Sequence, residues 1–524
     1  MSSPAATQTK PQERRQGTKA PVSRKTKIAI GAGVLLLGLG FLLWNTIGPF
    51  ARGPIIQDLA EASDSTVTSR SFHRTYFPFP GCVVEDLTFR HGSANNPPLI
   101  TIEKLTIRGS YLGVLSRHVS RITAEGAHVT IPPFGSHEPF HTQRSKIVVD
   151  EIIANGTLVD FASRDPQKRP LRFDIHAASL RNVGWSGPLH YRLKLHNPEP
   201  PGELTVSGEF GLWKEGDPGE TPISGDYTFE HAGLGVYGGI AGTLASRGKF
   251  GGPLKHIDIS GSTDIPDFEV RSGGHRVQLL TDFSAYVDAT AHGDTYLKRL
   301  DAHFGRTHVI VEGSIAGAEG RKGKAAMLDL SAPSGRIEDI LGLFVKRPRS
   351  PMSGPVSLKA KAEIPPGKEP FLKKVRLQGE FGIDQGSFTK PETQNEVNKL
   401  SAGARGEDKD DPETVLSDLK GQVTLEGGVA RFSDLSFSVP GAEARLHGTY
   451  NIINHGIDLH GTLRVDSKIS KTTSGIKALL LKVMDPFFKK KKKGEIVPVH
   501  IGGTFEHPQF GLDLAKGAND GAKQ

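Results

Sequence analysis

The sequence is almost devoid of cysteine. Cys82 is the only cysteine among 524 residues, so the chain cannot form an internal disulfide. Methionine and tryptophan are also scarce, at 4 and 3 residues against 62 glycines, a composition that favours strands and turns over long helices. A chain of this length exceeds one compact core. We therefore expect several domains or one elongated array, held together by side-chain burial and backbone hydrogen bonds.

Recognisable catalytic motifs are missing as well. The sequence contains no H-E-x-x-H, no paired C-x-x-C, no G-x-S-x-G and no Walker P-loop. Residues 233–238 match G-x-G-x-x-G, but further glycines follow where a phosphate-binding helix would have to begin. His137 and His141 are four residues apart, yet Pro139 opposes a helix between them and no acidic third ligand is evident. We predict that the protein is not an enzyme and has no cofactor and no metal site.

The chain also has only a small excess of positive over negative charge. The formal net charge is only +8, and much of the excess lies in the two ends of the chain. A nucleic-acid-binding protein would need a basic face along its length, so we expect no nucleic-acid partner.

Long apolar runs are absent except for one. Residues 28–47 carry no charge, and at ~1.5 Å per residue about twenty helical residues cross a bilayer core of ~30 Å. The preceding residues 1–27 are basic, so the positive-inside rule predicts a cytoplasmic N-terminus and an exported remainder. A cleaved signal peptide is the alternative, but it would have a shorter apolar segment and an A-x-A-like site. We predict a single-pass transmembrane anchor.

The exported part is expected to be mainly β. Apolar residues at helical spacing predict a short helix within residues 53–69, after which apolar and polar residues alternate in short runs. Further short helices are expected at residues 334–346 and after Asp411. The expected segments are a membrane-proximal helix with the first strands, two halves of one antiparallel sheet, and a flexible insertion in the second half: residues 53–119, 120–330, 331–524 and 390–410.

The alternation is clearest in residues 421–466, where turn signals such as Gly427-Gly428 and Pro440-Gly441 separate four apolar-polar runs. This pattern predicts an antiparallel meander with one apolar face. The candidate lipid-groove residues on that face are Val423, Leu425, Leu435, Phe437, Leu446, Leu459 and Leu463.

A second pattern, apolar-x-Gly-x-apolar, recurs inside the expected strands, for example at residues 206–210, 311–315, 446–450 and 459–463. With a period of two, each glycine shares a face with its apolar neighbours. Two interpretations stay open. The glycines could leave room for an acyl chain on a curved sheet, or they could simply bend strands or form bulges.

The segment 467–494 combines an apolar helical stripe, an aromatic pair and a lysine run. Such a combination is typical of an interfacial membrane element, because each lysine near an anionic surface contributes roughly 1 kcal/mol. The alternative is that the stripe packs on the end of the sheet and the lysines form a solvated loop. The membrane-interface candidates are Phe487, Phe488, Lys489, Lys490, Lys491, Lys492 and Lys493.

The order of these features resembles the bacterial AsmA-like family, relatives of TamB and of the bridge-like lipid-transfer group. The resemblance rests on the N-terminal anchor and on motifs at residues 76–81, 98–111, 239–244, 263–268, 461–488 and 507–512. It implies an elongated, folded-over β-sheet with a lipid-lined groove, anchored in the inner membrane with its bulk in the periplasm. It also implies a role in envelope lipid transport and outer-membrane homeostasis.

The partners that follow from this resemblance are phospholipid, the inner membrane and an envelope protein at the distal end. Two other functions stay open from the residues alone. One is an assembly factor that receives strands of outer-membrane proteins by edge pairing. The other is a structural β-array that binds no lipid, because an ordinary β-sandwich alternates in the same way.

Overall fold

The computed structural model describes residues 50–91, 97–111, 113, 118–131, 148–162, 170–184, 187–214, 217–271, 274–288, 293–317, 323–345, 349–367, 369–389, 417–439, 442–465, 496–504 and 508–512. The predicted transmembrane helix, the insertion at 390–410, the helix after Asp411 and the basic segment near the C-terminus lie outside these residues. Within the described ranges, no helix is both long enough and apolar enough to span a bilayer.

One sheet of 25 strands dominates the described chain. Its first half contains β1 (Thr66–Thr68), β2 (Ser71–Thr75), β3 (Gly81–Arg90), β4 (Ile100–Gly109), β5 (His118–Ile131), β6 (Val148–Phe161), β7 (Leu171–Val183), β8 (Leu189–Pro198), β9 (Pro201–Phe210), β10 (Pro222–Gly233), β11 (Ile240–Ala241), β12 (Thr243–Pro253) and β13 (His256–Val270). Its second half contains β14 (Val277–Asp288), β15 (Asp294–Phe304), β16 (Thr307–Gly317), β17 (Lys324–Arg336), β19 (Pro355–Ile364), β20 (Arg376–Ile383), β22 (Ser417–Glu426), β23 (Val429–Val439), β24 (Ala442–Asn451), β25 (Ile457–Val465), β26 (Ile496–Gly503) and β27 (Pro508–Leu512).

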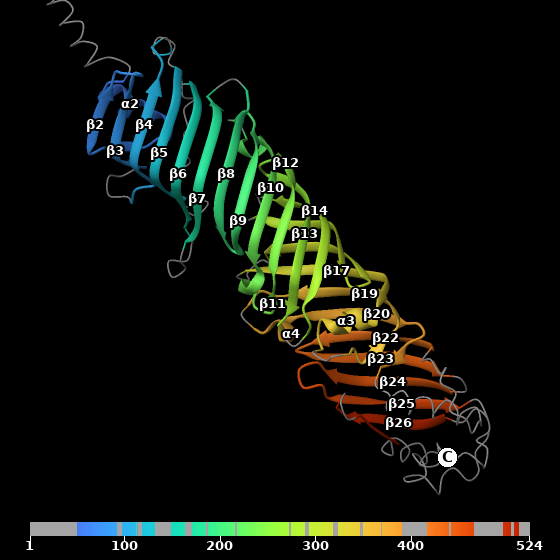
Figure 1. The fold of residues 1–524 in the computed structure, drawn as a ribbon. Coiled ribbons are helices and arrows are strands. Elements are labelled where there is room, and N and C mark those ends of the chain that lie inside the picture. The colour runs from blue at the N-terminus through green and yellow to red at the C-terminus, as the bar shows by residue number, and fades with distance from the viewer. Residues whose placement is uncertain are drawn as a thin grey trace, which may run out of the picture.

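The ladder follows the order of the chain, so the colours in Figure 1 run from blue to red along an elongated body. Strands β1 and β2 both pair with β3, and from β3 onward each sheet strand pairs with the next, except that β10 pairs directly with β12 and the short β11 pairs with β13. The described pairs are antiparallel except β5–β6, which is parallel with His118 opposite Val148. The expectation of a mainly β chain with a large, mostly antiparallel sheet is confirmed.

Few helices accompany the sheet, as expected. They are α2 (Arg52–Ser63), α3 (Ile337–Gly342), α4 (Phe371–Lys374) and the short 3-10 turns η2 (Pro218–Glu220) and η3 (Leu234–Tyr237). Helix α2 falls in the expected region and ends at Asp64, whose φ of 46° is left-handed. Helix α3 is shorter than the expected 334–346, because β17 continues to Arg336, which pairs with Pro355 of β19. The expected division at residues 330/331 falls inside β17, and the ladder runs through it.

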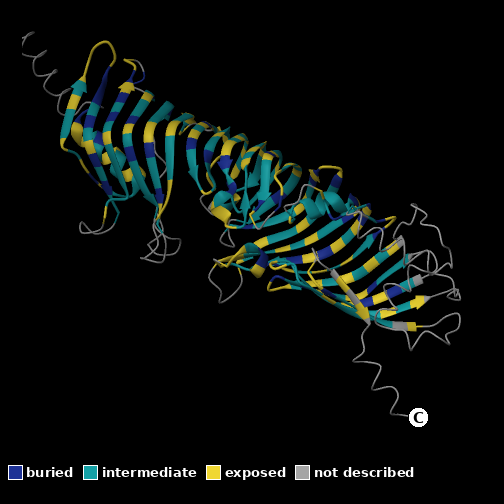
Figure 2. Ribbon diagram, turned by 60° about the horizontal axis from the view of Figure 1, so that its bottom comes forward, coloured by how far each residue is buried: buried dark blue, intermediate teal, exposed yellow. Residues whose placement is uncertain are grey.

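The strands expected in residues 421–466 correspond to β22 to β25, and the predicted turn at Gly427-Gly428 lies between β22 and β23. The predicted turn at Pro440-Gly441 lies outside the described residues. A separate two-stranded sheet pairs β18 (Met352–Ser353) with β21 (Ser387–Phe388). Strand alternation is visible in Figure 2 as stripes of exposed and less exposed residues across the ribbon.

A closed hydrophobic core lies at the N-terminal end of the sheet. Cys82, Val84 and Leu87 of β3 are 0% exposed, and Ile55 of α2 and Phe50 belong to the same cluster. Helix α2 therefore covers the apolar face of the first strands.

The sheet curls in its middle part. Phe371 of α4 lies directly against Gly239 beside β11, although β12 to β19 separate them in the ladder. His275 donates its backbone N–H to Gly342 O at the end of α3, a distance of 2.8 Å, although β14 to β17 lie between them. The two short helices thus join strand ends that a flat sheet would hold far apart.

Candidate functional site: the apolar face of the sheet

The strand register places apolar residues in a continuous row across the sheet. Cross-strand partners in a β-ladder project to the same face, so a chain of partners traces one line along it. The first line, row 1, runs from β3 to β25 through Cys82, Ile107, Ile122, Ile152, Leu180, Tyr191, Gly208, Gly225, Phe250, Ile259, Ala285, Leu297, Gly313, Leu328, Ala362, Leu377, Leu425, Ala430, Tyr450 and Ile457.

A second line, row 2, lies beside row 1 on the same face and runs from β2 to β27. Its members are Phe72, Val84, Leu105, Ala124, Ala154, Ala178, Leu193, Val206, Tyr227, Gly248, Gly261, Phe283, Leu300, Val311, Leu330, Ala360, Gly379, Val423, Phe432, Gly448, Leu459, Ile501 and Phe510. Every member of both rows is an apolar residue, a tyrosine or a glycine. We call the two rows together the apolar strip.

The seven predicted groove residues share this face. Leu425 is in row 1, and Val423 and Leu459 are in row 2. The other four lie beside the rows, because a bulge between Phe432 and Leu435, with Asp434 at a φ of 52°, keeps the alternation in phase. Leu435 and Leu446 are buried partners, and Phe437 and Leu463 are both half-buried and both paired with Ala444.

The exposure of the strip changes along its length. Over β3 and β4 its members are at most 4% exposed, whereas from β7 to β26 they are half-buried, apart from Tyr191 and four alanines. In Figure 2 the dark blue residues are accordingly gathered most densely near the N-terminal strands. The larger part of the strip thus keeps contact with solvent.

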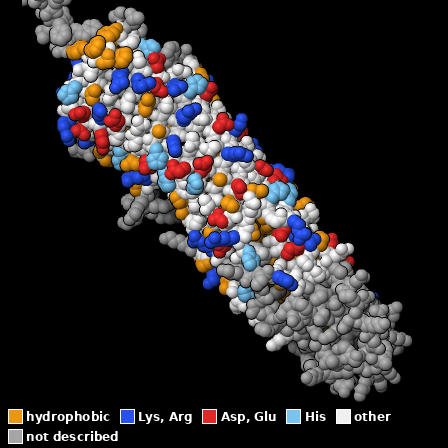
Figure 3. Space-filling model, viewed as in Figure 1, with side chains coloured by type: hydrophobic (Ala, Val, Ile, Leu, Met, Phe, Trp, Pro, Cys, Tyr) orange, Lys and Arg blue, Asp and Glu red, His pale blue; other side chains and the backbone are white. Residues whose placement is uncertain are grey.

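The opposite face is polar. There the register lines up Lys359, Glu380, Gln422 and Ser433 from β19 to β23. Figure 3 shows acidic, basic and histidine side chains interspersed along one side of the described chain, with hydrophobic side chains gathered mainly near the N-terminal end. The alternation therefore separates an apolar face from a charged one.

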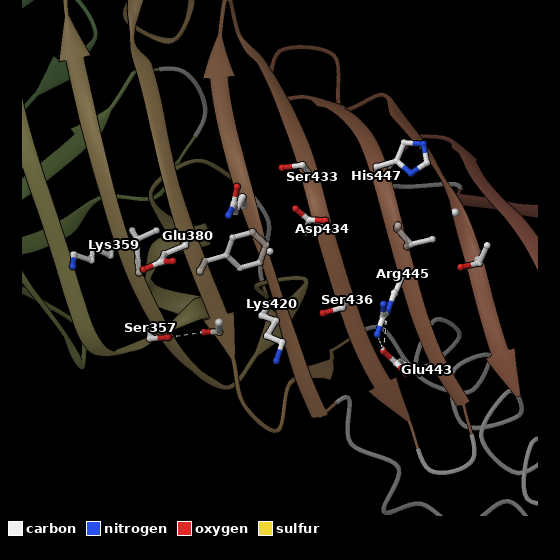
Figure 4. A pocket seen from close by; sticks show the side chains of 18 of the residues that line it. Ser357, Lys359, Glu380, Lys420, Ser433, Asp434, Ser436, Glu443, Arg445 and His447 are labelled. Atoms are coloured by element: carbon white, nitrogen blue, oxygen red, sulfur yellow. Dashed lines mark hydrogen bonds and ion pairs between the residues drawn. The ribbon is translucent and has the colours of Figure 1, made fainter. Parts of the chain in front are cut away.

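A hollow of about 1360 Å³ lies against β17 to β26, and its lining mixes charged and polar side chains with apolar ones such as Leu358 and Phe381. Figure 4 shows Lys359, Glu380, Lys420 and Arg445 around it, with Arg445 paired to Glu443 at 2.9 Å. Of the predicted groove residues only Leu446 is among its lining residues. The hollow is therefore distinct from the apolar strip.

The recurring glycines make close backbone contacts. A Cβ built on Gly208, Gly313, Gly448 or Gly461 would lie 1.9 to 2.1 Å from a carbonyl oxygen of the neighbouring strand. Gly313 and Gly448 also have a φ of 146°, which side-chain-bearing residues rarely adopt. These contacts favour the strand-bending interpretation over the one in which glycine clears space for an acyl chain.

Aromatic rings cover the glycines in the centre of the strip. A Cβ on Gly225 would meet the Phe250 ring and the Tyr191 hydroxyl at 2.9 Å, and one on Gly248 would meet the ring of Tyr227 at 2.8 Å. Tyr191 donates its hydroxyl to Ser224 O at 3.0 Å, and burial raises its pKa to about 12. The tyrosines thus lie along the sheet with apolar ring surface toward the strip.

Exposed aromatic residues gather at the N-terminal end. Tyr76, Phe77 and Phe79 precede β3, and Tyr111 follows β4; Phe77 is 88% exposed. The Tyr111 hydroxyl donates to Tyr76 O, and Gly109 contacts both Pro80 O and the Phe50 ring. This group, the aromatic rim, therefore lies beside the first described residue of the chain.

The membrane-interface candidates Phe487, Phe488 and Lys489 to Lys493 lie outside the described residues. The predicted groove residues lie only between 423 and 463, and the continuation of the strip back to β3 was not predicted. The same alternation was present there, but the register that joins the strands into rows cannot be read from one sequence.

Comparisons with known proteins add no name to this geometry: no family model, no curated protein and no solved structure matches the chain.

Proposed function

We propose that the apolar strip binds the acyl chains of phospholipids and lets them pass along the sheet. In this proposal residues 28–47 anchor the chain in the inner membrane of a diderm bacterium, with the sheet in the periplasm. The observation that carries it is the strip itself, because it continues without a charged residue from β3 to β25 and stays half-exposed over most of that length.

The size of the strip supports a ligand. At ~4.8 Å per strand, the path from β3 to β25 is about 90 Å long, and two rows about 7 Å apart cover on the order of 1,000 Å². Soluble monomers rarely leave an apolar patch of more than a few hundred Å² uncovered. Half a bilayer core is about 15 Å thick, so the strip has room for several acyl chains in line.

The middle of the sheet supports a groove rather than a flat surface. The contact of Phe371 with Gly239 brings helix α4 against the end of β11. The close backbone contacts at the glycines favour bending of the strands. Both features favour a folded-over sheet with acyl chains against its apolar side and polar headgroups toward water.

The aromatic rim supports an orientation in which the N-terminal end of the strip faces the inner membrane. Tyrosine and phenylalanine at the edge of a membrane protein suit the interface between headgroups and acyl chains. Phe50 next to the rim follows the expected anchor directly, so the N-terminal end of the strip would face the inner membrane. The far end would then meet an envelope partner, in a role in lipid transport and outer-membrane homeostasis.

Assembly of outer-membrane proteins by strand pairing is supported less well. Apart from the two-residue β11, each sheet strand from β3 to β26 has both of its edges occupied by neighbours in the described ladder. A substrate strand could pair only at the ends of the sheet, whereas acyl chains need no free backbone groups.

The test is lipid analysis of the full chain, purified in a mild detergent, by extraction and mass spectrometry. Two adjacent residues of β22 give a matched pair: Leu425 is on the strip and Thr424 is exposed on the polar face. Leu425→Asp places a charge where acyl CH₂ groups would bind, each worth about 0.8 kcal/mol, whereas Thr424→Asp does not.

We expect phospholipid to accompany the wild-type chain and the Thr424→Asp variant and to fall about tenfold with Leu425→Asp, a loss of about 1.4 kcal/mol. Circular dichroism shows whether both variants keep the sheet. Wild-type protein without lipid, or equal loss in both variants, would contradict the proposal and favour a structural array.

A further inference from the structure

Two histidines and an aspartate converge on the polar face near the far end of the sheet. Asp458 and His460 are two residues apart on β25, and His500 is the cross-strand partner of His460 on β26. The Nε2 atoms of His460 and His500 lie 3.1 and 3.0 Å from the same Oδ1 atom of Asp458. Their rings stack with centroids 4.4 Å apart.

The strand geometry explains the convergence. Residues two apart on a strand project to the same face, and a cross-strand pair is closer still, at about 4.5 to 5.5 Å between Cα atoms. An Asp-x-His pair on one strand and a histidine opposite therefore form a three-donor group without any loop. The side chains are 35%, 36% and 64% exposed for His460, His500 and Asp458, so the group is open to ions in solution.

The spacing of the donors suits a first-row divalent metal. Zn²⁺ binds imidazole nitrogen and carboxylate oxygen at about 2.0 to 2.2 Å, which puts tetrahedral ligand atoms about 3.3 Å apart. The three donor atoms lie within 4.8 Å of one another. With the proton on Nδ1, each Nε2 has a lone pair available for a metal ion.

A second group in the same sheet has the same pattern and provides a comparison. Asp301 and His303 are two residues apart on β15, and His308 lies opposite His303 on β16, with stacked rings 4.4 Å apart. There, however, Arg299 donates to both oxygens of Asp301 at 2.7 and 2.8 Å. The guanidinium neutralises the carboxylate and occupies the positions that a metal would need.

A third carboxylate shows the same contrast. Asp258, beside His256 on β13, accepts a 2.6 Å hydrogen bond from Lys298. In the described chain Asp458 contacts the two histidines instead, and a histidine can exchange a proton for a metal ion. Asp301 and Asp258 also contact a histidine, His308 and His256 respectively, but each is held by a cationic side chain as well. Asp458 contacts two histidines and, among the described residues, no lysine or arginine.

We propose that Asp458, His460 and His500 bind a first-row divalent cation, with Zn²⁺ as the best match. Two imidazoles and one carboxylate make three protein ligands, which leaves a further position for water or another ligand. The ion would join β25 to β26, which are adjacent in the ladder but 30 residues apart along the chain, from Val465 to Ile496. His447, opposite His460 on β24, lies one strand away with its ring 6.4 Å from that of His460.

The experiment is a Zn²⁺ titration of the full chain, purified through a tag without histidine, treated with chelator and then freed of it. Isothermal titration calorimetry should show one saturable site per chain. Asp458→Asn and His500→Gln, which keep side-chain shape, should each weaken Zn²⁺ binding at least tenfold. His308→Gln in the comparison group should leave the titration unchanged.

Two results would overturn the assignment. One is a wild-type titration equal to that of the Asp458→Asn/His460→Gln/His500→Gln variant. The other is loss of binding in His308→Gln. Co²⁺ gives a second readout: its visible d–d absorption should appear with wild-type protein and disappear with His460→Gln, and circular dichroism reports whether each variant keeps its sheet. Neither measurement depends on lipid, so the site and the strip are tested separately.

Discussion

The two ends of the apolar strip differ in what covers them. Over β3 and β4 the helix α2 packs on the strip, and Cys82 and Val84 are 0% exposed. Over β22 and β25 the same rows contain Leu425 and Leu459, which are half-buried. The ladder is continuous in both places, with bulges at the far end, so an open apolar face is compatible with the sheet. The open part is where the strip can accept a ligand, and the covered part is where it serves stability.

Thiol chemistry gives the largest contrast between the two ends. Burial raises the pKa of the Cys82 thiol to about 12, against some opposition from Arg74, so the reactive thiolate is nearly absent at pH 8. We expect Cys82 to react with a maleimide on the order of a thousandfold more slowly than a cysteine introduced by Leu425→Cys. Peptide mass spectrometry distinguishes the two sites. Equal labelling of both would show that α2 does not seal the N-terminal end.

Truncation of one leucine at each end should differ in its energetic cost. Leu87→Ala removes a 0% exposed side chain and leaves a cavity, which costs about 3 kcal/mol. Leu425→Ala removes a half-exposed one and should cost about 1 kcal/mol. Hydrogen exchange of β3–β4 and of β22–β23 measures each local effect. A cost at position 425 equal to that at 87 would mean that the far end is covered as well.

Passage along the strip can be separated from binding to it. Leu328 is in row 1 near the middle, and Met327 beside it is 52% exposed on the polar face. We expect Leu328→Asp to slow transfer of fluorescent phospholipid between vesicles about tenfold, equal to about 1.4 kcal/mol, and Met327→Asp to leave transfer unchanged. Lipid crosslinking at Leu425 should persist in both variants. Unchanged transfer in Leu328→Asp would mean that the strip stores lipid without conducting it.

Acid should weaken the N-terminal half of the ladder slightly. Hydrogen bonds from Arg172, with help from His128, lower the pKa of Asp160 on β6 to about 2 from 3.8. A lowered carboxyl pKa stabilises the fold above the unfolded value, and that stability is lost as pH falls through the folded one. We expect β6 and β7 to lose about 1 kcal/mol of protection between pH 4 and pH 2, measured by hydrogen exchange corrected for its intrinsic rate. In Arg172→Gln this pH-dependent loss should shrink; an identical loss would contradict the assignment.

Local features were predictable from the sequence where they depend on neighbouring residues. The alternation of residues 421–466 predicted β22 to β25 and the face of Val423 and Leu463, because strand period and turn chemistry are local properties. Helix α2 followed from its spacing in the same way. The position of row 1 could not be predicted in this way, because it depends on the register of many strand pairs.

Non-local features escaped the sequence analysis for the same reason. The role of Gly448 depends on the carbonyl of Asp458 on the next strand, and the metal-ligand group joins residues 458, 460 and 500. The parallel pairing of β5 with β6 could not be predicted, because the alternation of apolar and polar residues in these strands would be the same in an antiparallel pair. The hollow at β17 to β26 is lined in part by charged side chains that share a face, which becomes visible only once the strands are paired.

The chain-ordered ladder has a consequence for how the molecule is made. Apart from the first strands and the short β11, each new strand adds to the one synthesised just before it, so the sheet can grow hairpin by hairpin from its N-terminal end. Such short-range pairing lowers the entropy lost on closing each loop and favours fast folding. The helix-capped end would act as the nucleus and the order of translation as the order of assembly. Inserting or deleting a hairpin would then lengthen or shorten the body by about 10 Å without rebuilding the rest.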